Sequence, residues 1–282
     1  MLIQWFPGHM AKTKRLIIEH LKAVDVAAEL LDARIPLSSA NPMVEELLSG
    51  KPRIVILNKA DLADPGMTKA WESYYKRKGV AAVSMSCGNG KDKKKFLRLI
   101  KEAAGPMLEK WKRRGLKTRS ARIMILGIPN VGKSTLINFI SGTAAARTAN
   151  TPGHTRGKQW VRLSQGLDLL DTPGVLWPKF EDQAVGLRLA LIGSIKEEIL
   201  NTTEMAMEFI GFLKKSYPGV LVERYSVDES KENLEILEEI ARIRGCLMKG
   251  NQTDIDKAGR LLLEDFRSLR LGKLSLEVPD AQ

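Results

Sequence analysis

Cysteine, histidine and long apolar runs are all scarce in this sequence. Its two cysteines, Cys87 and Cys246, lie far apart and in no CxxC or His/Cys cluster, so we expect free thiols, a reducing compartment and no zinc site. No stretch approaches the roughly 18 apolar residues that span a membrane, and the N-terminus lacks the apolar core of a signal peptide. These absences predict a cytoplasmic protein with no membrane anchor.

Positive charge is in excess. The 282 residues include 45 Lys and Arg against 33 Asp and Glu, a net charge of +12, while 44% apolar residues are enough to bury the core of one or two domains. The charge favours a polyanionic partner, and nucleic acid more than membrane, because no strongly amphipathic basic anchor stands out. A basic protein that is merely soluble remains the alternative.

The stretch RIMILGIPNVGKSTL, residues 122–136, carries the strongest motif. A strand pattern ends in a glycine loop and continues as a helix pattern, so residues 127–134 read GxxxxGKS in the context of a phosphate-binding loop. The backbone N–H groups of such a loop and the positive end of the helix bind phosphate oxygens. We expect Lys133 to reach the β- and γ-phosphates and to serve catalysis, and Ser134 to ligate Mg²⁺. The predicted nucleotide-binding residues of this loop are Gly127, Ile128, Pro129, Asn130, Val131, Gly132, Lys133, Ser134 and Thr135.

A second motif, Asn58-Lys59-Ala60-Asp61, follows an apolar strand pattern. A carboxylate accepts two hydrogen bonds from the N1–H and N2–H₂ groups of guanine, a pair that adenine does not offer, so Asp61 favours GTP over ATP. Lys59 is expected along the face of the base, with Asn58 bracing the loop. Ser84, Met85 and Ser86 follow the next strand pattern and are expected to contact guanine O6 through backbone N–H groups. A surface turn beside an unrelated P-loop ATPase is the alternative.

Two further loops fit the Mg²⁺ and γ-phosphate contacts of a GTPase. Asp171-Thr172-Pro173-Gly174 matches DxxG, in which Asp171 holds Mg²⁺ and the Gly174 N–H senses the γ-phosphate. Thr155, within Thr151-Pro152-Gly153-His154-Thr155, is expected to ligate Mg²⁺ only while the γ-phosphate is present. The base-reading loops precede the phosphate loop, whereas an ordinary GTPase chain begins with the phosphate loop. The order therefore predicts a circularly permuted domain.

Strand patterns alternate with helix patterns up to Pro178, with each motif at a strand's carboxyl end. This arrangement predicts the α/β class: an open, mainly parallel six-stranded sheet that binds its ligand at the carboxyl edge. The predicted strands are Val24–Leu31, Arg53–Leu57, Val80–Val83, Ile123–Leu126, Gln159–Leu163 and Leu167–Leu170. A helix is predicted over Trp71–Lys78, and the basic stretch Glu109–Arg122 is interpreted as a solvated connector or a polyanion contact. His20 is interpreted as a surface residue.

Helical patterns alone follow Pro178 and predict a small all-α domain. They cover Ala184–Lys196, Thr203–Lys215, Asn233–Ile243 and Ile255–Leu269. In the last of these, apolar residues three or four apart form one face that is interpreted as core. We therefore place a circularly permuted GTPase domain at residues 1–178, with an N-terminal extension at residues 1–22, and a helical domain at residues 179–282. Without a coiled-coil heptad or an obvious dimer strand, we expect a monomer.

With these motifs in this order, the sequence resembles the ribosome biogenesis GTPase A (YlqF/RbgA) family of circularly permuted GTPases. The resemblance rests on NKAD, GIPNVGKSTLIN, TPGHT, LLDTPGVLWPKFED, the leading WFPGHMAK, RGCLM at residues 244–248 and LGKLSLE at residues 271–277, and it runs nearly end to end. It implies a GTPase that converts GTP to GDP and phosphate, stimulated by the ribosome. It also implies that the helical domain contacts rRNA of the maturing large ribosomal subunit, and that hydrolysis favours release.

The resemblance also directs attention to His9 and Asn130. Val175 follows DxxG where many GTPases carry a glutamine that orients water, and an apolar residue cannot do this. We hypothesise that His9, in the segment WFPGHM, takes that role when the ribosome docks, although His9 could equally be ordered against Trp5 or contact RNA without chemistry. Asn130 matches the asparagine that holds K⁺ in potassium-activated GTPases. His154 departs from the aliphatic residue common in relatives.

Other functions remain open from the sequence alone. A P-loop ATPase or kinase is disfavoured by Asp61. A GTPase that acts on another RNA is compatible with the charge, as is an RNA-binding module that uses nucleotide with negligible turnover.

Overall fold

The computed structural model describes residues 18–42, 44, 48, 50–115, 120–142, 159–163, 166–171, 182–195 and 201–280. Its residues form two compact units. The helical unit covers Asp182–Leu274, and the sheet unit contains the described residues before Asp182 together with the segment that begins at Ser275. The sequence places its domain boundary after residue 178 and keeps residues 179–282 together, whereas here the C-terminal segment groups with the sheet unit.

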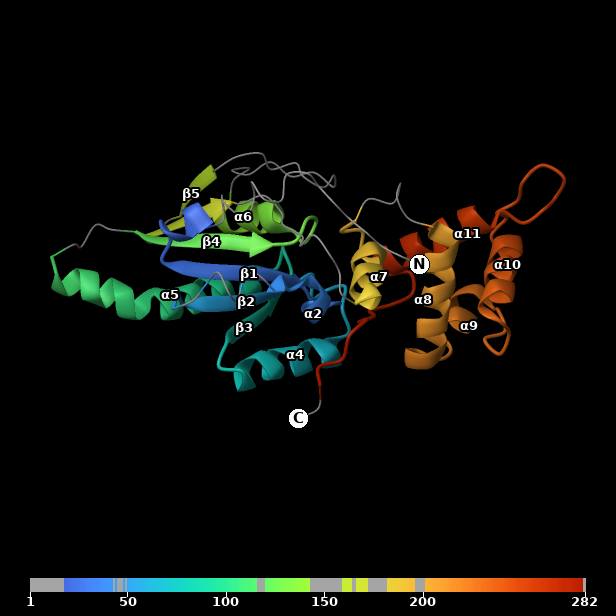
Figure 1. Ribbon diagram of the computed structural model, residues 1–282, viewed down its shortest axis with the longest axis horizontal. Helices are drawn as coiled ribbons and strands as arrows, with labels where there is room; N and C mark the ends of the chain where they lie inside the picture. Colours follow the sequence, from blue (N-terminus) through green and yellow to red (C-terminus); the bar gives the residue numbers. More distant parts are fainter. Residues whose placement is uncertain are drawn as a thin grey trace. The chain divides into compact units, whose positions relative to one another are not determined.

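The sheet unit is built on the mainly parallel six-stranded sheet that the sequence predicts (Figure 1). The strand order is β3-β2-β1-β4-β6-β5, and only β5 runs antiparallel, as the partner of β6 in a hairpin. All seven residues of β1 are buried. Because alternate side chains of a strand point to opposite faces, both faces of the sheet are covered there. The strands are β1 Val26–Asp32, β2 Arg53–Asn58, β3 Ala81–Met85, β4 Ala121–Gly127, β5 Gln159–Leu163 and β6 Leu167–Asp171.

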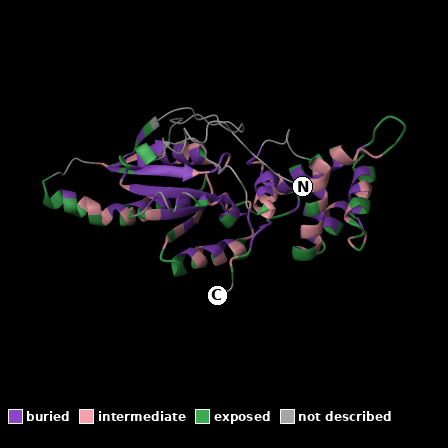
Figure 2. Ribbon diagram, viewed as in Figure 1, coloured by how far each residue is buried: buried purple, intermediate pink, exposed green. Residues whose placement is uncertain are grey.

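Helices α4 (Pro65–Arg77) and α5 (Gly90–Arg113) pack against the β1–β3 half of the sheet, and α6 (Lys133–Ser141) packs against β4, β5 and β6. On α4, Trp71 and Tyr75 join Val55 and Leu57 of β2 in one apolar cluster. Figure 2 shows the central strands buried along their length and the outer sides of α4 and α5 exposed. The core therefore lies between the sheet and its helices, which leaves the strand ends for function.

Two local predictions in the sheet unit are wrong in extent. Helix α4 begins at Pro65 and not at Trp71, because the Asp64 side chain accepts a hydrogen bond from the Met67 N–H and proline is favoured in the first turn. The predicted connector at Glu109–Arg122 is helical as far as Arg113, because buried Trp111 continues the apolar face of α5. His20 is another correction: it is 3% exposed, next to Leu21 in the core.

The helical unit contains α7 Gln183–Leu191, α8 Thr202–Ser216, α9 Val220–Tyr225, α10 Asn233–Ile243 and α11 Ile255–Arg267. Phe209 of α8 and Phe266 of α11 pack with their ring centroids 4.9 Å apart, and Leu262 is also buried, so the apolar face of the last helix is core as predicted. Helix α7 ends five residues earlier than predicted, because Gly193 adopts φ +77° and the Gly193 and Ser194 N–H groups donate to the Ala190 and Leu189 carbonyls, which closes the helix. The sequence patterns missed α9.

None of the helices in the described ranges combines the length and apolarity that crossing a bilayer requires. This matches the absence of long apolar runs in the sequence.

The C-terminal segment closes the sheet unit through residues that are distant in sequence. We call Ser275–Glu277 the C-terminal clasp. The Glu277 carboxylate accepts hydrogen bonds from the Leu37 N–H at 2.7 Å, from the Ser38 N–H at 2.9 Å and from the Ser38 hydroxyl, at the start of the short helix α2 (Pro36–Ser39). The Leu276 N–H donates to the Arg34 carbonyl, and the Trp71 indole N–H donates to the Glu277 carbonyl. The clasp thus fixes the loop that leaves β1.

We expect Glu277→Ala to lower the free energy of unfolding of the sheet unit by about 2 kcal/mol, because the substitution removes the charged acceptor of two backbone donors and of the buried Ser38 hydroxyl. Urea denaturation measures this change. Asp280→Ala removes an exposed carboxylate three residues further on and is the matched control, with an expected effect below about 0.5 kcal/mol. Equal effects of the two substitutions would contradict a structural role for the clasp.

Candidate functional site

The candidate site lies at the carboxyl ends of β1, β2 and β4, where the strand order reverses. The chain runs from β1 outward to β2 and β3, then returns to β4 on the other side of β1. Connections that leave neighbouring strands in opposite directions open a crevice at their carboxyl ends. The register places Asp32 opposite Asn58, and Leu30 opposite Gly127, so the predicted base-reading and phosphate loops begin side by side.

The loop between β4 and α6 needs glycine at two positions. Gly127 has φ +157°, and a Cβ atom built on it would lie 2.6 Å from the Leu30 carbonyl oxygen. Gly132 has φ +100°, and its Cβ atom would lie 2.5 Å from Asn58 Nδ2. Neither position can hold a larger residue without displacing a neighbour. The chain therefore passes close to β1 and to the base loop before α6 begins at Lys133.

Lys133 is 7% exposed and is held over the loop by the loop's own backbone. Its Nζ donates hydrogen bonds to the Ile128 carbonyl at 2.7 Å and to the Gly127 carbonyl at 3.1 Å. These two carbonyls hold a positive charge at the N-terminus of α6, where the helix dipole and the first N–H groups also attract an anion. The arrangement is suited to phosphate.

The base loop is joined directly to the phosphate loop by two side chains. Asn58 Nδ2 donates to the Val131 carbonyl at 2.8 Å, and Lys59 Nζ donates to the Asn130 carbonyl at 2.8 Å. Lys59 and Asn130 both adopt positive φ, +57° and +58°. The structure thus brings together Asn58, Lys59 and the loop 127–133, which the sequence assigned to one nucleotide.

The remaining base-loop residues are arranged around Ser86. The Asp61 N–H donates to Ser86 Oγ at 3.1 Å, and the Asp61 side chain lies at the surface. The Ser84 N–H donates to Glu72 Oε1 at 2.7 Å, and the Ser86 N–H donates to Asp92 Oδ2 at 3.1 Å. Both N–H groups therefore already have acceptors within the protein. A contact with guanine O6 would have to replace these bonds, and it stays a prediction.

Sequence reasoning missed a buried ion cluster, Asp32, Arg34 and Lys59, at the end of β1. The Asp32 carboxylate is fully buried and accepts hydrogen bonds from Arg34 Nε at 2.9 Å and Arg34 Nη2 at 2.8 Å, while Lys59 Nζ lies 3.2 Å from Asp32 Oδ2. Burial alone would raise the pKa of Asp32, but the two cations hold that pKa far below its usual range. The available signal was a charged pair directly after an apolar strand that ends at the same edge as Asn58.

Cys87 also lies at the base loop and was not predicted to do so. Its thiol is 3.7 Å from Asn58 Oδ1, and burial, assisted by the Asp61 carboxylate, raises the pKa of Cys87 to about 11. The side chain is therefore a neutral thiol at pH 7. Cys87 and Cys246 are both free, as expected.

Three predicted site residues, His9, Thr155 and Gly174, lie outside the described residues. For Asp171 the structure describes the backbone only. Asp171 is the last residue of β6 and pairs with Ile125 of β4, the strand that leads into the phosphate loop. Ser134 is the second residue of α6. Hydroxyl and carboxylate oxygens are ligands that Mg²⁺ takes together with phosphate, so these two residue types fit the metal.

Known proteins of similar sequence are named as GTPases. A family model described as 50S ribosome-binding GTPase matches residues 122–241. A protein of Bacillus cereus named ribosome biogenesis GTPase A is 47% identical over 281 residues, covering 99% of this chain and 95% of the relative. A protein of Thermotoga maritima with the same name is 32% identical over 278 residues, covering 99% and 95%.

Solved structures give the same result for the fold. The GDP-bound structure of TM YlqF superposes with a TM-score of 0.72 at 28% identity, covering 95% of this chain and all of the other. GNP-bound YlqF from T. maritima gives a TM-score of 0.69 at 28% identity, covering 96% and 100%.

The two left-handed glycines that flank α6 provide a matched pair of variants. Gly132→Ala should weaken nucleotide binding by about tenfold or more, because its Cβ atom displaces Asn58 from the Val131 carbonyl. Gly142→Ala has a comparable backbone conformation, φ +75°, but meets open space, so it should cost about 1 kcal/mol of stability and leave affinity unchanged. Titration with a fluorescent GTP analogue measures both. Equal loss of affinity in the two variants would contradict a role for the close approach of the loops.

We expect Asp32→Asn to destabilise the sheet unit by about 3 kcal/mol at pH 7, because it leaves Arg34 buried without its counter-charge. The pKa of Asp32 is lowered in the folded state, so its contribution is present above the unfolded value of about 3.9 and is lost as the pH falls below it. The stability difference between wild type and variant should therefore shrink below about pH 4. Urea titrations from pH 7 to pH 3 measure it.

Glu102→Gln is the control for this experiment, since Glu102 pairs with Arg98 but its side chain is 63% exposed. Its effect should stay below about 0.5 kcal/mol at every pH. An Asp32→Asn variant as stable as Glu102→Gln would contradict the structural importance of the cluster.

Proposed function

This chain belongs to the ribosome biogenesis GTPase A family and is a GTPase, and we propose that it assembles on the maturing large ribosomal subunit and leaves after GTP hydrolysis. The observation that carries the proposal is the direct joining of a base loop to a phosphate loop by Asn58 and Lys59. Curated relatives that match nearly the whole chain and are named ribosome biogenesis GTPase A support the choice of partner.

Selectivity for guanine rests on Asp61 in this proposal. Its carboxylate accepts hydrogen bonds from guanine N1–H and N2–H₂, and its position is fixed by the bond from its own N–H to Ser86 Oγ. Lys59 lies along the base while its ammonium stays bound to the Asn130 carbonyl and to Asp32. The base therefore binds at a loop that already contacts the phosphate loop.

Charge stabilisation at the γ-phosphate falls to the residues around α6. Lys133 supplies a cation, and the N–H groups of the loop donate to phosphate oxygens. Ser134, Asp171 and Thr155 would hold Mg²⁺, which neutralises developing charge on the β- and γ-phosphate oxygens. Asn130 would hold K⁺ near the same oxygens. The Gly174 N–H senses the γ-phosphate, and with Val175 in the usual glutamine position, His9 orients water in the docked state.

The cycle is a shift between two states of the protein. GTP orders Thr155 and Gly174 and favours the form that binds the subunit, and loss of the γ-phosphate removes those contacts and favours release. The net charge of +12 supports an RNA-rich partner, with the helical domain at residues 179–282 as the predicted rRNA-binding part. Both the monomeric state and the domain assignment remain part of the proposal.

We expect purified large ribosomal subunits to raise the rate of GTP hydrolysis in KCl by about tenfold or more, because docking completes a site that lacks a glutamine for water. Phosphate release from the full-length protein, with and without subunits, measures the rate. Small subunits are the control. No stimulation, or equal stimulation by the two subunits, would contradict the proposed partner while leaving the GTPase itself intact.

The same reaction should run several-fold faster in KCl than in NaCl, because Na⁺ does not replace K⁺ at the Asn130 side chain. Asn130→Gly tests the residue, since glycine keeps φ +58° without strain while removing the amide. The variant should hydrolyse GTP at one rate in both salts. Equal wild-type rates in KCl and NaCl would remove K⁺ from the mechanism.

His9→Ala should lower the subunit-stimulated rate by about 100-fold and leave the basal rate unchanged, because His9 is expected to act only in the docked state. Co-sedimentation with subunits is the control for docking. Full stimulated turnover in the variant would reject a catalytic role, and loss of co-sedimentation would assign His9 to binding instead.

A further inference from the structure

Helix α5 concentrates the positive charge of this protein. The 25 residues Gly90–Arg114 contain ten Lys and Arg against three Asp and Glu, and so carry more than half of the net charge of +12. Basic charge is not spread evenly over the helices, since α10 contains Glu235, Glu238 and Glu239 against Arg242 alone. The excess on α5 is therefore a local feature that calls for a local explanation.

The basic side chains form a stripe along one side of the helix. Lys94, Arg98 and Lys101 are four and three residues apart, and Lys112 lies five full turns after Lys94, about 27 Å further along the helix axis. All four are exposed. Gly105 lies between the two halves of the stripe with open space above its Cα atom, so the backbone is accessible there. We call these five residues the basic stripe.

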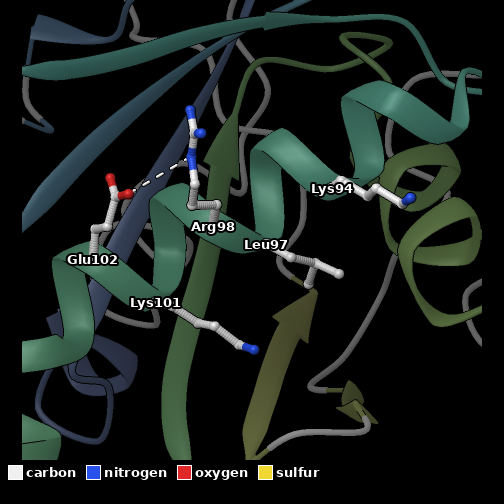
Figure 3. A pocket seen from close by; sticks show the side chains of 5 residues that line it. All are labelled: Lys94, Leu97, Arg98, Lys101 and Glu102. Carbon is white, nitrogen blue, oxygen red and sulfur yellow. Dashed lines mark ion pairs between the residues drawn. The ribbon is translucent and has the colours of Figure 1, made fainter.

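Figure 3 shows the first half of the stripe. Lys94 and Lys101 extend their ammonium groups away from the helix, with Leu97 between them, while Arg98 turns towards Glu102. Together these side chains line a shallow hollow. The two ammonium groups lie apart with the apolar Leu97 between them, which suits the alternating charge and sugar surface of a nucleic-acid backbone.

The exposed acids of α5 leave the lysines of the stripe uncompensated. Glu102 pairs with Arg98 at 3.6 Å, and Glu109 pairs with Arg113 at 4.0 Å. Within the described part of the chain, neither Lys94 nor Lys101 nor Lys112 forms an ion pair. A helix face that only faces solvent is usually stabilised by mixing the two signs three and four residues apart. Here three like charges share one side at a cost in repulsion, which a polyanion would relieve.

The aromatic residues of α5 indicate which part of a nucleic acid this side contacts. Phe96 and Trp111 are both buried in the core, so the stripe presents no ring on which a base could stack. Recognition through cations and a bare glycine is suited to phosphates, and not to base edges. Base-paired RNA, whose phosphates line the grooves and whose bases are stacked inside, matches these groups.

We propose that the basic stripe of α5 is a docking surface for the phosphate backbone of double-helical RNA. That the polyanion is RNA rests on the proposed function. The stripe is separate from the nucleotide site and lies in the sheet unit. GTP is therefore bound, and RNA held, by one compact unit of the chain.

The test uses the full-length protein and a fluorescently labelled RNA duplex of roughly 20 base pairs, longer than the stripe. The test variant carries Lys94→Gln, Lys101→Gln and Lys112→Gln. In 0.1 M KCl it should bind the duplex at least about tenfold more weakly than wild type. The slope of log K against log salt should also be smaller by about two to three, since about one counterion is released for each phosphate contact. Fluorescence anisotropy over a KCl series gives both numbers.

The matched control is Lys69→Gln/Lys76→Gln/Arg77→Gln, which removes three exposed cations from α4 and lowers the net charge by the same amount. It should leave the affinity and the slope close to wild type. Equal losses in the two triple variants would overturn the proposal in favour of a general effect of net charge. A wild-type protein that does not bind the duplex, or binds poly-glutamate more tightly through the same lysines, would overturn the assignment to RNA.

A second measurement separates this inference from the proposed function. Basal GTP hydrolysis should be the same in wild type and in both triple variants, because the stripe lies outside the nucleotide site. If duplex binding depends on the stripe but large subunits neither bind nor stimulate the protein, the docking surface stands and the proposed partner fails. If subunits stimulate wild type and the stripe variant equally, the partner stands and the docking surface is rejected.

Discussion

The ammonium group of Lys59 is the contact on which the site depends. It lies between the Asp32 carboxylate at the end of β1 and the Asn130 carbonyl in the phosphate loop, while its own backbone follows β2. Three segments of the chain are thereby fixed to one another by a single side chain. Because Asp32 is fully buried and also holds Arg34, the position of Lys59 is set by the core and not by the ligand. A nucleotide therefore meets a site whose halves are already aligned, which reduces the ordering that binding must supply.

The permuted chain order makes such a contact necessary. The base loop comes from the first half of the sheet and the phosphate loop from the second, with α4, β3 and α5 between them in sequence. Their register across β1 brings the two loops to one edge, and the close approach at Gly132 and Gly127 keeps them there. Within this connecting segment, α5 lies on the outside of the sheet. Its buried side closes the core through Phe96 and Ile100, so its opposite side is available to other partners.

The sequence predicted those parts of the structure whose chemistry is local. The loop 127–134 and Asn58-Lys59-Ala60-Asp61 were found because their residue types and spacing follow from phosphate and guanine recognition, and buried strands follow from apolar runs. The Asp32 and Arg34 cluster was missed because charged residues after a strand normally indicate solvent, and only the folded sheet shows them to be enclosed. The sequence prediction ended helix α5 too early because the many charged residues after Glu109 indicated a connector. The burial of Trp111, which continues the helix, depends on the neighbouring strands and is not visible in the sequence. Glu277 could not have been found, since nothing in its neighbourhood in sequence indicates a partner 239 residues away.

The C-terminal clasp has a consequence for how the protein is made. Synthesis proceeds from the N-terminus, and domains fold as their residues emerge. Asp32 at the end of β1 and Arg34 in the loop after it emerge early, but Glu277, which fixes that loop through Ser38, follows Ser38 by 239 residues. The strands that form the sheet are therefore complete well before their final constraint exists. A nascent chain of this protein can assemble its sheet before the clasp has been synthesised, but its nucleotide site is fully braced only once Ser275–Glu277 have emerged.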